Sequence, residues 1–323
     1  MKRLSFFVLF TLSILILRAQ EQKITITGKP IVTLFANYHT GLGHANSNSG
    51  FELDRAYLGY QFKLTENFGG KVIFDIGETK LKGADLERVA YVKNAMLSWT
   101  PGNFTLDFGL VKTGQFSLQE SFWGYRYILK SFDDEYKFGP SADMGIIGKY
   151  RFNDYISADL SFTNGEGYKK INKDNNYRYG AGVTLTPVTD LTFRIYGDIY
   201  TGNSDSTENQ SNLSLFAGYR HKLFRIGAEY NKLWNATFTE GNNKNGYSVY
   251  TSVNAGKKFT VFGRYDYLHS QEEQFRETDG QRILAGVQYT PIRFLKLSPN
   301  FRNWNPQNGK SESFIYLNLE FKL

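Results

Sequence analysis

The chain is built largely from short segments in which apolar and polar residues alternate. In one example, Ala56, Leu58, Tyr60, Phe62 and Leu64 are apolar, and the residues between them are mostly polar or glycine. A period of two places all of the apolar side chains on one face, so each segment predicts a β-strand with one apolar and one polar face. Comparable runs are 68–76, 104–110, 144–152, 156–162, 177–185, 191–199, 213–219, 224–230, 247–253, 259–267, 283–289, 295–301 and 315–323.

The connections between these segments alternate between short and long. Tight turns such as Glu66-Asn67 and Asn153-Asp154 alternate with longer polar stretches such as 164–176 and 235–245. With Ile31–Tyr38 and Val89–Trp99 added, we count about 16 strands, and this pattern is typical of outer-membrane barrels. The phase of Val89–Trp99 is ambiguous. The sequence therefore predicts an all-β fold, a transmembrane antiparallel β-barrel of about 16 strands.

Composition supports a barrel that faces lipid. The chain has 27 Phe and 22 Tyr but a mean hydropathy of only −0.42. In a membrane barrel only alternate residues contact lipid, so average hydropathy stays low while the aromatic content is high. The chain contains no cysteine, which excludes disulfides and a lipid-modified N-terminal cysteine.

The N-terminus predicts export. Lys2 and Arg3 precede an apolar run from Leu4 to Leu17, and Ala19 offers a small residue for cleavage. We interpret residues 1–19 as a signal peptide, residues 20–323 as the barrel, and the bacterial outer membrane as its location. Removing the three bases of residues 1–19 leaves 35 basic and 31 acidic residues, a net charge of +4, too small an excess for a nucleic-acid-binding protein.

The polar face of the predicted strands carries more bases than acids. Rings of arginine and lysine favour anions in a pore, and arginine binds oxyanions through two parallel hydrogen bonds. Ion pairing along the wall is the alternative role for these charges. The predicted pore-lining, anion-binding bases are Arg55, Lys71, Lys149, Arg151, Arg178, Arg194, Arg220, Arg225, Arg264, Arg282, Lys296 and Arg302. The acids on the same face are Asp75, Asp107, Asp159, Asp198, Glu229, Asp266 and Glu320.

One connection, Lys112–Pro140, is far too long and too aromatic for a simple turn. A long insertion of this kind in a compact fold is usually functional or disordered. We expect it to fold inward as the third outer loop and to narrow the pore as a constriction loop. Its charged residues are Lys112, Glu120, Arg126, Lys130, Asp133, Asp134, Glu135 and Lys137.

No enzyme, cofactor or metal site emerges from the sequence. The four histidines are scattered without metal-ligand spacing, and no Ser, His and acid combination can be assembled on one wall. The run Asp133–Glu135 is an acidic stretch that either pairs with neighbouring bases, the interpretation we favour, or holds a calcium ion.

Several motifs resemble the phosphate-selective porin O and P family. They are the Phe51–Gly59 run FELDRAYLG, Phe74-Asp75, Ala90–Val92 and the Phe108–Phe116 run FGLVKTGQF. The resemblance implies a sixteen-stranded, often trimeric porin with an inward third loop. It also implies a ladder of lumen arginines, with Arg55 as the arginine of the second strand and Lys112–Pro140 as the constriction loop.

These observations favour a non-enzymatic porin for passive diffusion of small solutes, with a preference for anions such as phosphate. Its expected partners are outer-membrane lipid, small anionic solutes and further copies of itself in a homotrimer. The alternative is a non-conducting barrel whose outer loops bind a surface partner. Loops rich in Asn and Tyr, such as Asn235–Asn245, are compatible with that role.

Overall fold

A computed structural model describes residues 26–78, 88–170, 175–202, 208–271 and 278–323. Residues 1–19, interpreted above as a signal peptide, lie outside this part of the chain. In the order of the sequence, the strands are β1 (Thr27–Leu42), β2 (Ser49–Lys63), β3 (Phe68–Glu78), β4 (Arg88–Trp99), β5 (Phe104–Lys112), β6 (Ala142–Arg151), β7 (Ile156–Thr163), β8 (Arg178–Val188), β9 (Leu191–Tyr200), β10 (Gln210–Arg220), β11 (Phe224–Trp234), β12 (Lys244–Asn254), β13 (Phe259–Ser270), β14 (Gly280–Ile292), β15 (Leu295–Pro306) and β16 (Glu312–Lys322).

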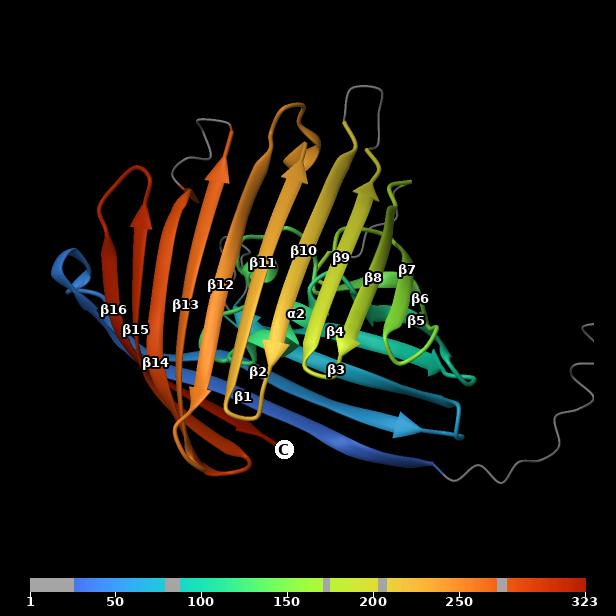
Figure 1. The fold of residues 1–323 in the computed structure, drawn as a ribbon, viewed down its shortest axis with the longest axis horizontal. Helices are drawn as coiled ribbons and strands as arrows, with labels where there is room; N and C mark the ends of the chain where they lie inside the picture. The colour runs from blue at the N-terminus through green and yellow to red at the C-terminus, as the bar shows by residue number, and fades with distance from the viewer. Residues whose placement is uncertain (1–25, 79–87, 171–174, 203–207, 272–277) are drawn as a thin grey trace, which may run out of the picture.

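These strands form one closed antiparallel barrel of 16 strands, as the alternating pattern predicted. Each strand pairs with its neighbours in sequence, and β1 pairs with β16 from Thr33–Lys322 to Leu42–Ser313. Closure leaves no unpaired sheet edge. The short turns gather at one end of the barrel, here called the turn end, and the longer connections at the other, the loop end (Figure 1).

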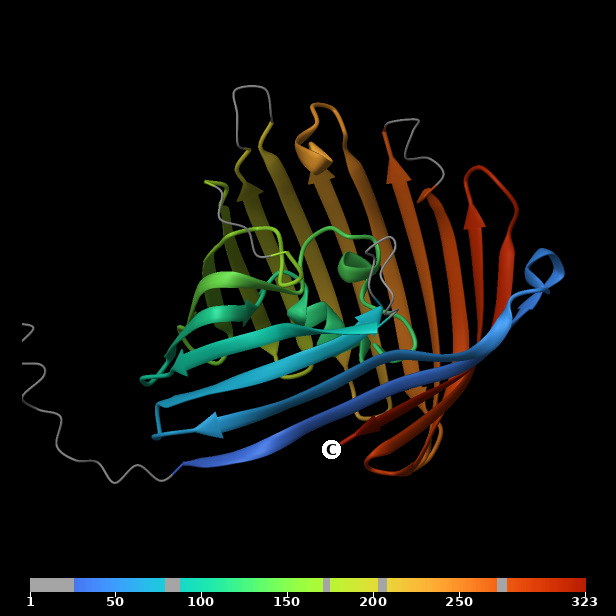
Figure 2. The same ribbon diagram turned by 180° about the vertical axis from the view of Figure 1, so that it is seen from behind.

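Only short helices interrupt the strands in the described residues. They are η1 (Gly43–Ala45), α2 (Ser117–Trp123), α3 (Phe132–Glu135) and η2 (Ala236–Phe238). Both views show α2 inside the ring of strands rather than beyond its ends (Figures 1 and 2). Among the described residues, no helix is long and apolar enough to cross a membrane.

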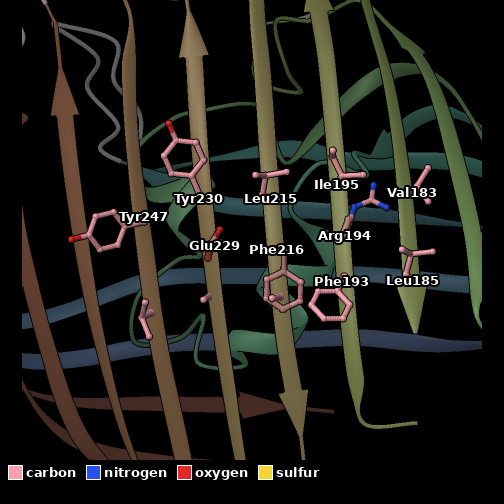
Figure 3. A pocket seen from close by; sticks show the side chains of 13 residues that line it. Val183, Leu185, Phe193, Arg194, Ile195, Leu215, Phe216, Glu229, Tyr230 and Tyr247 are labelled. Carbon is pink, nitrogen blue, oxygen red and sulfur yellow. The ribbon is translucent and has the colours of Figure 1, made fainter. Parts of the chain in front are cut away.

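The outer wall is apolar, as the alternation requires. Figure 3 shows Val183, Ile195, Leu215 and Tyr247 on the outer face of β8–β12, around a shallow hollow of about 530 Å³. Arg194, on β9 between Phe193 and Ile195, forms its contacts on the opposite, inner face. The same strands therefore present an apolar face outward and a charged face inward.

A β-bulge explains the ambiguous phase of the fourth strand. The register of β3 with β4 shifts between Ile73 and Phe74, which pair with Asn94 and Val92 and leave Lys93 between them. A bulge puts two residues opposite one, so the inward and outward positions exchange beyond it. Lys93 and Asn94 consequently both face the lumen.

Candidate functional site

Residues 113–141, here called the inner loop, leave the end of β5 and run along the inner wall. The Gly114 carbonyl accepts a hydrogen bond from Arg194 on β9 at 3.1 Å. Further along, the Gln119 side chain donates to Ser214 on β10 at 3.0 Å. The Tyr127 carbonyl accepts from Asn318 on β16 at 3.1 Å. The loop thus contacts the lumen faces of strands on much of the circumference.

An aromatic cluster holds the inner loop to the wall. Trp123 is 1% exposed and lies at ring-centroid distances of 5.0 Å from Tyr125, 5.3 Å from Tyr250 and 6.2 Å from Phe262. Its indole N–H donates to the Leu129 carbonyl at 2.8 Å. The buried members of the cluster are Phe35, Phe122, Trp123, Tyr125, Tyr127, Ile128, Leu129, Phe216, Tyr250, Phe262 and Leu284.

Two glycines make this docking sterically possible. Gly124 ends α2 in the left-handed conformation with φ 74°, the usual glycine helix end. A Cβ there would lie 2.7 Å from a guanidinium nitrogen of Arg225 on β11. On β10, a Cβ at Gly218 would lie 2.5 Å from the Phe122 ring. Both positions therefore need a residue without a side chain.

The charged residues of the inner loop pair with different partners. Arg126 forms ion pairs with Glu120 and with Asp134, the latter at 2.5 Å. Glu135 pairs with Arg282 of β14 at 2.7 Å. Lys112, at the end of β5, lies 3.6 Å from Glu120. The backbone carbonyls of Lys130 and Lys137 accept hydrogen bonds from Arg264 and Lys244, at 2.6 and 3.2 Å.

The acidic run Asp133–Glu135 does not converge on one point. Asp133 is fully buried and accepts hydrogen bonds from Gln115 at 2.9 Å and Ser214 at 3.3 Å. Its neighbours pair with Arg126 and Arg282 instead. Among the described residues, no group of three potential metal ligands gathers. Asp134 and Glu135 thus pair with bases, as the favoured interpretation of the run expects, whereas Asp133 is buried and pairs with none.

Burial and neighbouring charge shift the acids of this run in opposite directions. Burial raises the pKa of the Asp133 carboxyl well above its usual range, and nearby Glu229 adds to the rise. Burial alone would also raise the pKa of Glu135, but Arg282 outweighs it and lowers that pKa. A buried acid and a partly buried ion pair thus contact the wall from the same short helix, α3.

Most of the predicted wall bases lie in ion pairs. Arg55 and Asp75 are 2.5 Å apart, and the Tyr168 hydroxyl from the next long connection also donates to Asp75 at 2.5 Å. Arg151 pairs with Asp154 at the turn end and is largely exposed, so it belongs to the rim. The remaining wall pairs are Lys149–Asp107, Arg178–Asp198, Arg194–Asp159, Arg264–Asp266 and Lys296–Glu320.

Four of the predicted bases stand apart from these ion pairs. Within the described part of the chain, Lys71, Arg220, Arg225 and Arg302 of the predicted set form no ion pair within 4.0 Å. Arg302 instead lies over the Tyr316 ring at 3.6 Å. Ion pairing was the alternative role for the wall charges, and it applies to more than half of the predicted bases.

A lysine-rich cavity of about 370 Å³ lies beside the inner loop. Lys71, Lys93 and Lys112 line it from adjacent strands β3, β4 and β5. Lys296 and Lys322 line it from β15 and β16, and Glu120 and Glu320 are its acids.

Lys93 was left out of the predicted lumen set because the bulge obscured its phase. Its ammonium group donates to the Tyr57 hydroxyl at 3.1 Å and lies 4.6 Å from the centre of that ring. The sequence did contain a clue to the bulge. Lys93 lies in the same alternating set as the apolar residues of its strand, and an unbroken strand would therefore place its charge in lipid.

Comparisons with known proteins agree on the fold. No protein-family model and no curated protein matches the sequence. The solved structures that resemble it include an anion-selective porin from Comamonas acidovorans, with 12% identity, a TM-score of 0.67, and 93% of this chain and 100% of that chain covered. OprB of Pseudomonas putida has 9% identity, a TM-score of 0.72, and coverage of 92% and 94%.

OmpT of Vibrio cholerae gives a third comparison, with 12% identity, a TM-score of 0.65, and coverage of 93% of this chain and 100% of that chain. At such low identities the likeness speaks for the fold alone. The motif resemblance to the phosphate-selective O and P family remains a sequence observation. The chain has the closed sixteen-stranded barrel fold of outer-membrane porins.

Proposed function

We propose that this protein is an outer-membrane porin through which small solutes diffuse passively, with a preference for anions. Barrels of about 16 to 18 strands leave an aqueous channel. The apolar outer wall and the charged inner wall suit lipid on one side and water on the other. In this proposal the turn end faces the periplasm, the loop end faces outward, and no catalytic role is assigned.

The observation that carries the anion preference is the lysine-rich cavity beside the inner loop. Lys71, Lys93 and Lys112 stand on three adjacent strands, where they raise the local concentration of anions. Glu120 and Asp134 lie on the loop side. A solute at this level experiences a transverse field from wall bases to loop acids. The inner loop, predicted as 112–140, would then be the constriction.

The lysine and arginine side chains of the inner wall suggest which anions the pore prefers. Lysine and arginine both bind oxyanions, and arginine does so through two parallel hydrogen bonds. We propose phosphate or a similar oxyanion as a preferred solute, in keeping with the motif resemblance. Most of the predicted bases lie in ion pairs, so we expect general passage of small anions alongside phosphate.

Export and assembly complete the proposal. We expect cleavage close to Ala19 and insertion of the mature chain into the outer membrane. A homotrimer is the proposed assembly, because one of the structures of similar fold, OmpT of Vibrio cholerae, is described in a trimer form.

Ion selectivity in a planar bilayer tests the proposal. With a potassium chloride gradient across the membrane, the sign of the reversal potential reports whether chloride or potassium passes more readily. We expect an anion-selective potential and partial block by phosphate. A cation-selective potential would contradict the anion preference, and a barrel that never conducts would contradict the porin itself.

One observation favours the alternative of a non-conducting barrel. The inner loop reaches from wall to wall, because Tyr127 lies 6.4 Å from Phe35 on β1. If the loop plugs the lumen, the outer loops could serve a surface partner. Absence of conductance even after deletion of the inner loop would support this second function.

A further inference from the structure

Two arginines stand directly opposite each other at the turn end of the barrel. Arg220 ends β10 and pairs in register with Arg225 of β11. Both side chains face the lumen and line a cavity of about 350 Å³, separate from the outer-wall hollow. Like charges directly opposite on neighbouring strands destabilise a sheet, so a group that neutralises both charges would stabilise the pair.

The inner loop compensates this pair only in part. Arg225 donates to the Trp123 carbonyl at 2.8 Å, and Arg220 donates to the Ser121 carbonyl at 3.4 Å. These carbonyls belong to the last turn of α2, where a helix leaves its C=O groups without partners and carries partial negative charge. Each guanidinium uses one nitrogen in this way, and Arg225 also hydrogen-bonds with the Tyr125 side chain. The remaining N–H groups can still donate.

The aromatic rings of the loop hold both guanidinium groups in place. Arg220 lies 4.7 Å from the centre of the Phe122 ring, and Arg225 lies 5.3 Å from the centre of the Tyr125 ring. Such contacts restrain a guanidinium without neutralising its charge. The two forks are therefore ordered while both positive charges remain.

The rest of the cavity is polar and contributes no acid. Ser252, Asn254, Thr260 and Gln288 line it from β12, β13 and β14, and Lys296 lines it from β15. In the described part of the chain, no carboxylate lines this cavity or pairs with either arginine. The lysine-rich cavity differs, because Glu120 and Glu320 line it.

We propose that Arg220 and Arg225 form a binding site for a small oxyanion, such as sulfate, phosphate or a small carboxylate, which fastens the inner loop to the wall. The bound anion neutralises the repulsion between the two forks. Both arginines then keep their hydrogen bonds to the end of α2. The proposal goes beyond transport, because the site lies at the turn end and needs no current through the constriction.

Direct binding of radiolabelled sulfate to the detergent-solubilised barrel tests this site. The double variant Arg220→Gln with Arg225→Gln should bind sulfate at least tenfold more weakly than the unmodified protein. Arg293→Gln is the matched control, since Arg293 lies at the turn between β14 and β15, stacks on Phe294 at 4.3 Å, and does not line the cavity. Its affinity should be unchanged.

A second measurement reports on the loop. Sulfate at constant ionic strength should raise the unfolding temperature of the unmodified barrel by a few degrees and should not do so in the double variant. If the double variant does not fold, Arg220→Gln alone decides, because it keeps the Arg225 contact to Trp123 and should still lose most of the affinity.

Equal sulfate affinity in the unmodified protein and in the arginine variants would overturn the proposal, as would no measurable binding at all. The proposed transport function fails separately. The sign of the reversal potential tests the lysine-rich cavity, so a cation-selective potential would overturn the anion preference and leave the sulfate result intact. Equal sulfate affinity in the variants would overturn this site and leave the sign of the reversal potential as the test of transport.

Discussion

Substitution of Trp123 by alanine should release the inner loop from the wall. Trp123 is 1% exposed, packs against three aromatic rings, and lies 5.0 Å from the Arg264 guanidinium. Truncating a buried Trp costs about 3–5 kcal/mol. The Leu129 carbonyl would also lose its hydrogen bond, which adds about 1–3 kcal/mol where water cannot replace it.

This energy acts on docking of the loop rather than on the barrel, because Trp123 belongs to no strand. The loss of packing alone, about 3–5 kcal/mol, lowers the ratio of docked to released loop by roughly two to three and a half orders of magnitude. The released loop should enter and leave the pore, so single-channel recordings should show frequent current steps and greater noise.

Trp99→Ala provides the matched control. Trp99 is 46% exposed on the outer wall and contacts Phe104 at 6.4 Å. Its removal should leave current and noise unchanged. If Trp123→Ala inserted normally and conducted like the unmodified protein, the aromatic cluster would not control the position of the loop, and the reasoning would be refuted.

The remaining predictions concern the width of the pore, the charge of its lysines and the pH dependence of stability. Deletion of 115–137 should raise single-channel conductance, whereas unchanged conductance would place the loop away from the conducting path. Replacing Lys93 and Lys112 by glutamine should shift the reversal potential toward cations, while Lys257→Gln at a turn should not; equal shifts would remove the lysines from the selectivity filter. Burial raises the pKa of Asp133, so ionisation opposes folding and stability should fall as pH rises from about 4 through that pKa. Asp133→Asn should reduce this fall, as unfolding temperatures at about pH 4 and pH 8 would show; an equal fall in the variant would assign it to other groups.

The alternation of apolar and polar residues was sufficient to predict the barrel. In a lipid-facing strand it is fixed which residues face outward and which face the lumen. A one-residue slip would put charges such as those of Arg194 and Arg264 in hydrocarbon. One exception was β4, where the bulge at Lys93 exchanges the two faces within one strand. Periodicity assumes an unbroken pleat, so a bulge is the feature it misses.

The pairing of the charges could not be predicted in the same way. The alternation of apolar and polar residues places Arg282 on the inner face. Its partner Glu135, however, comes from a loop that is distant in sequence. Likewise, the sequence does not distinguish Arg220 and Arg225 from the bases that form ion pairs. Only the strand register shows that these two arginines lie opposite each other. Contacts across the lumen depend on how the inner loop docks. Docking of a loop produces no periodic pattern of residues, so the sequence does not predict it.

The most direct test of the account is the reversal potential of the purified protein in a planar bilayer under a potassium chloride gradient. The account predicts a conducting pore with an anion-selective potential, which moves toward zero when Lys93 and Lys112 are neutralised. A cation-selective potential in the unmodified protein would contradict it.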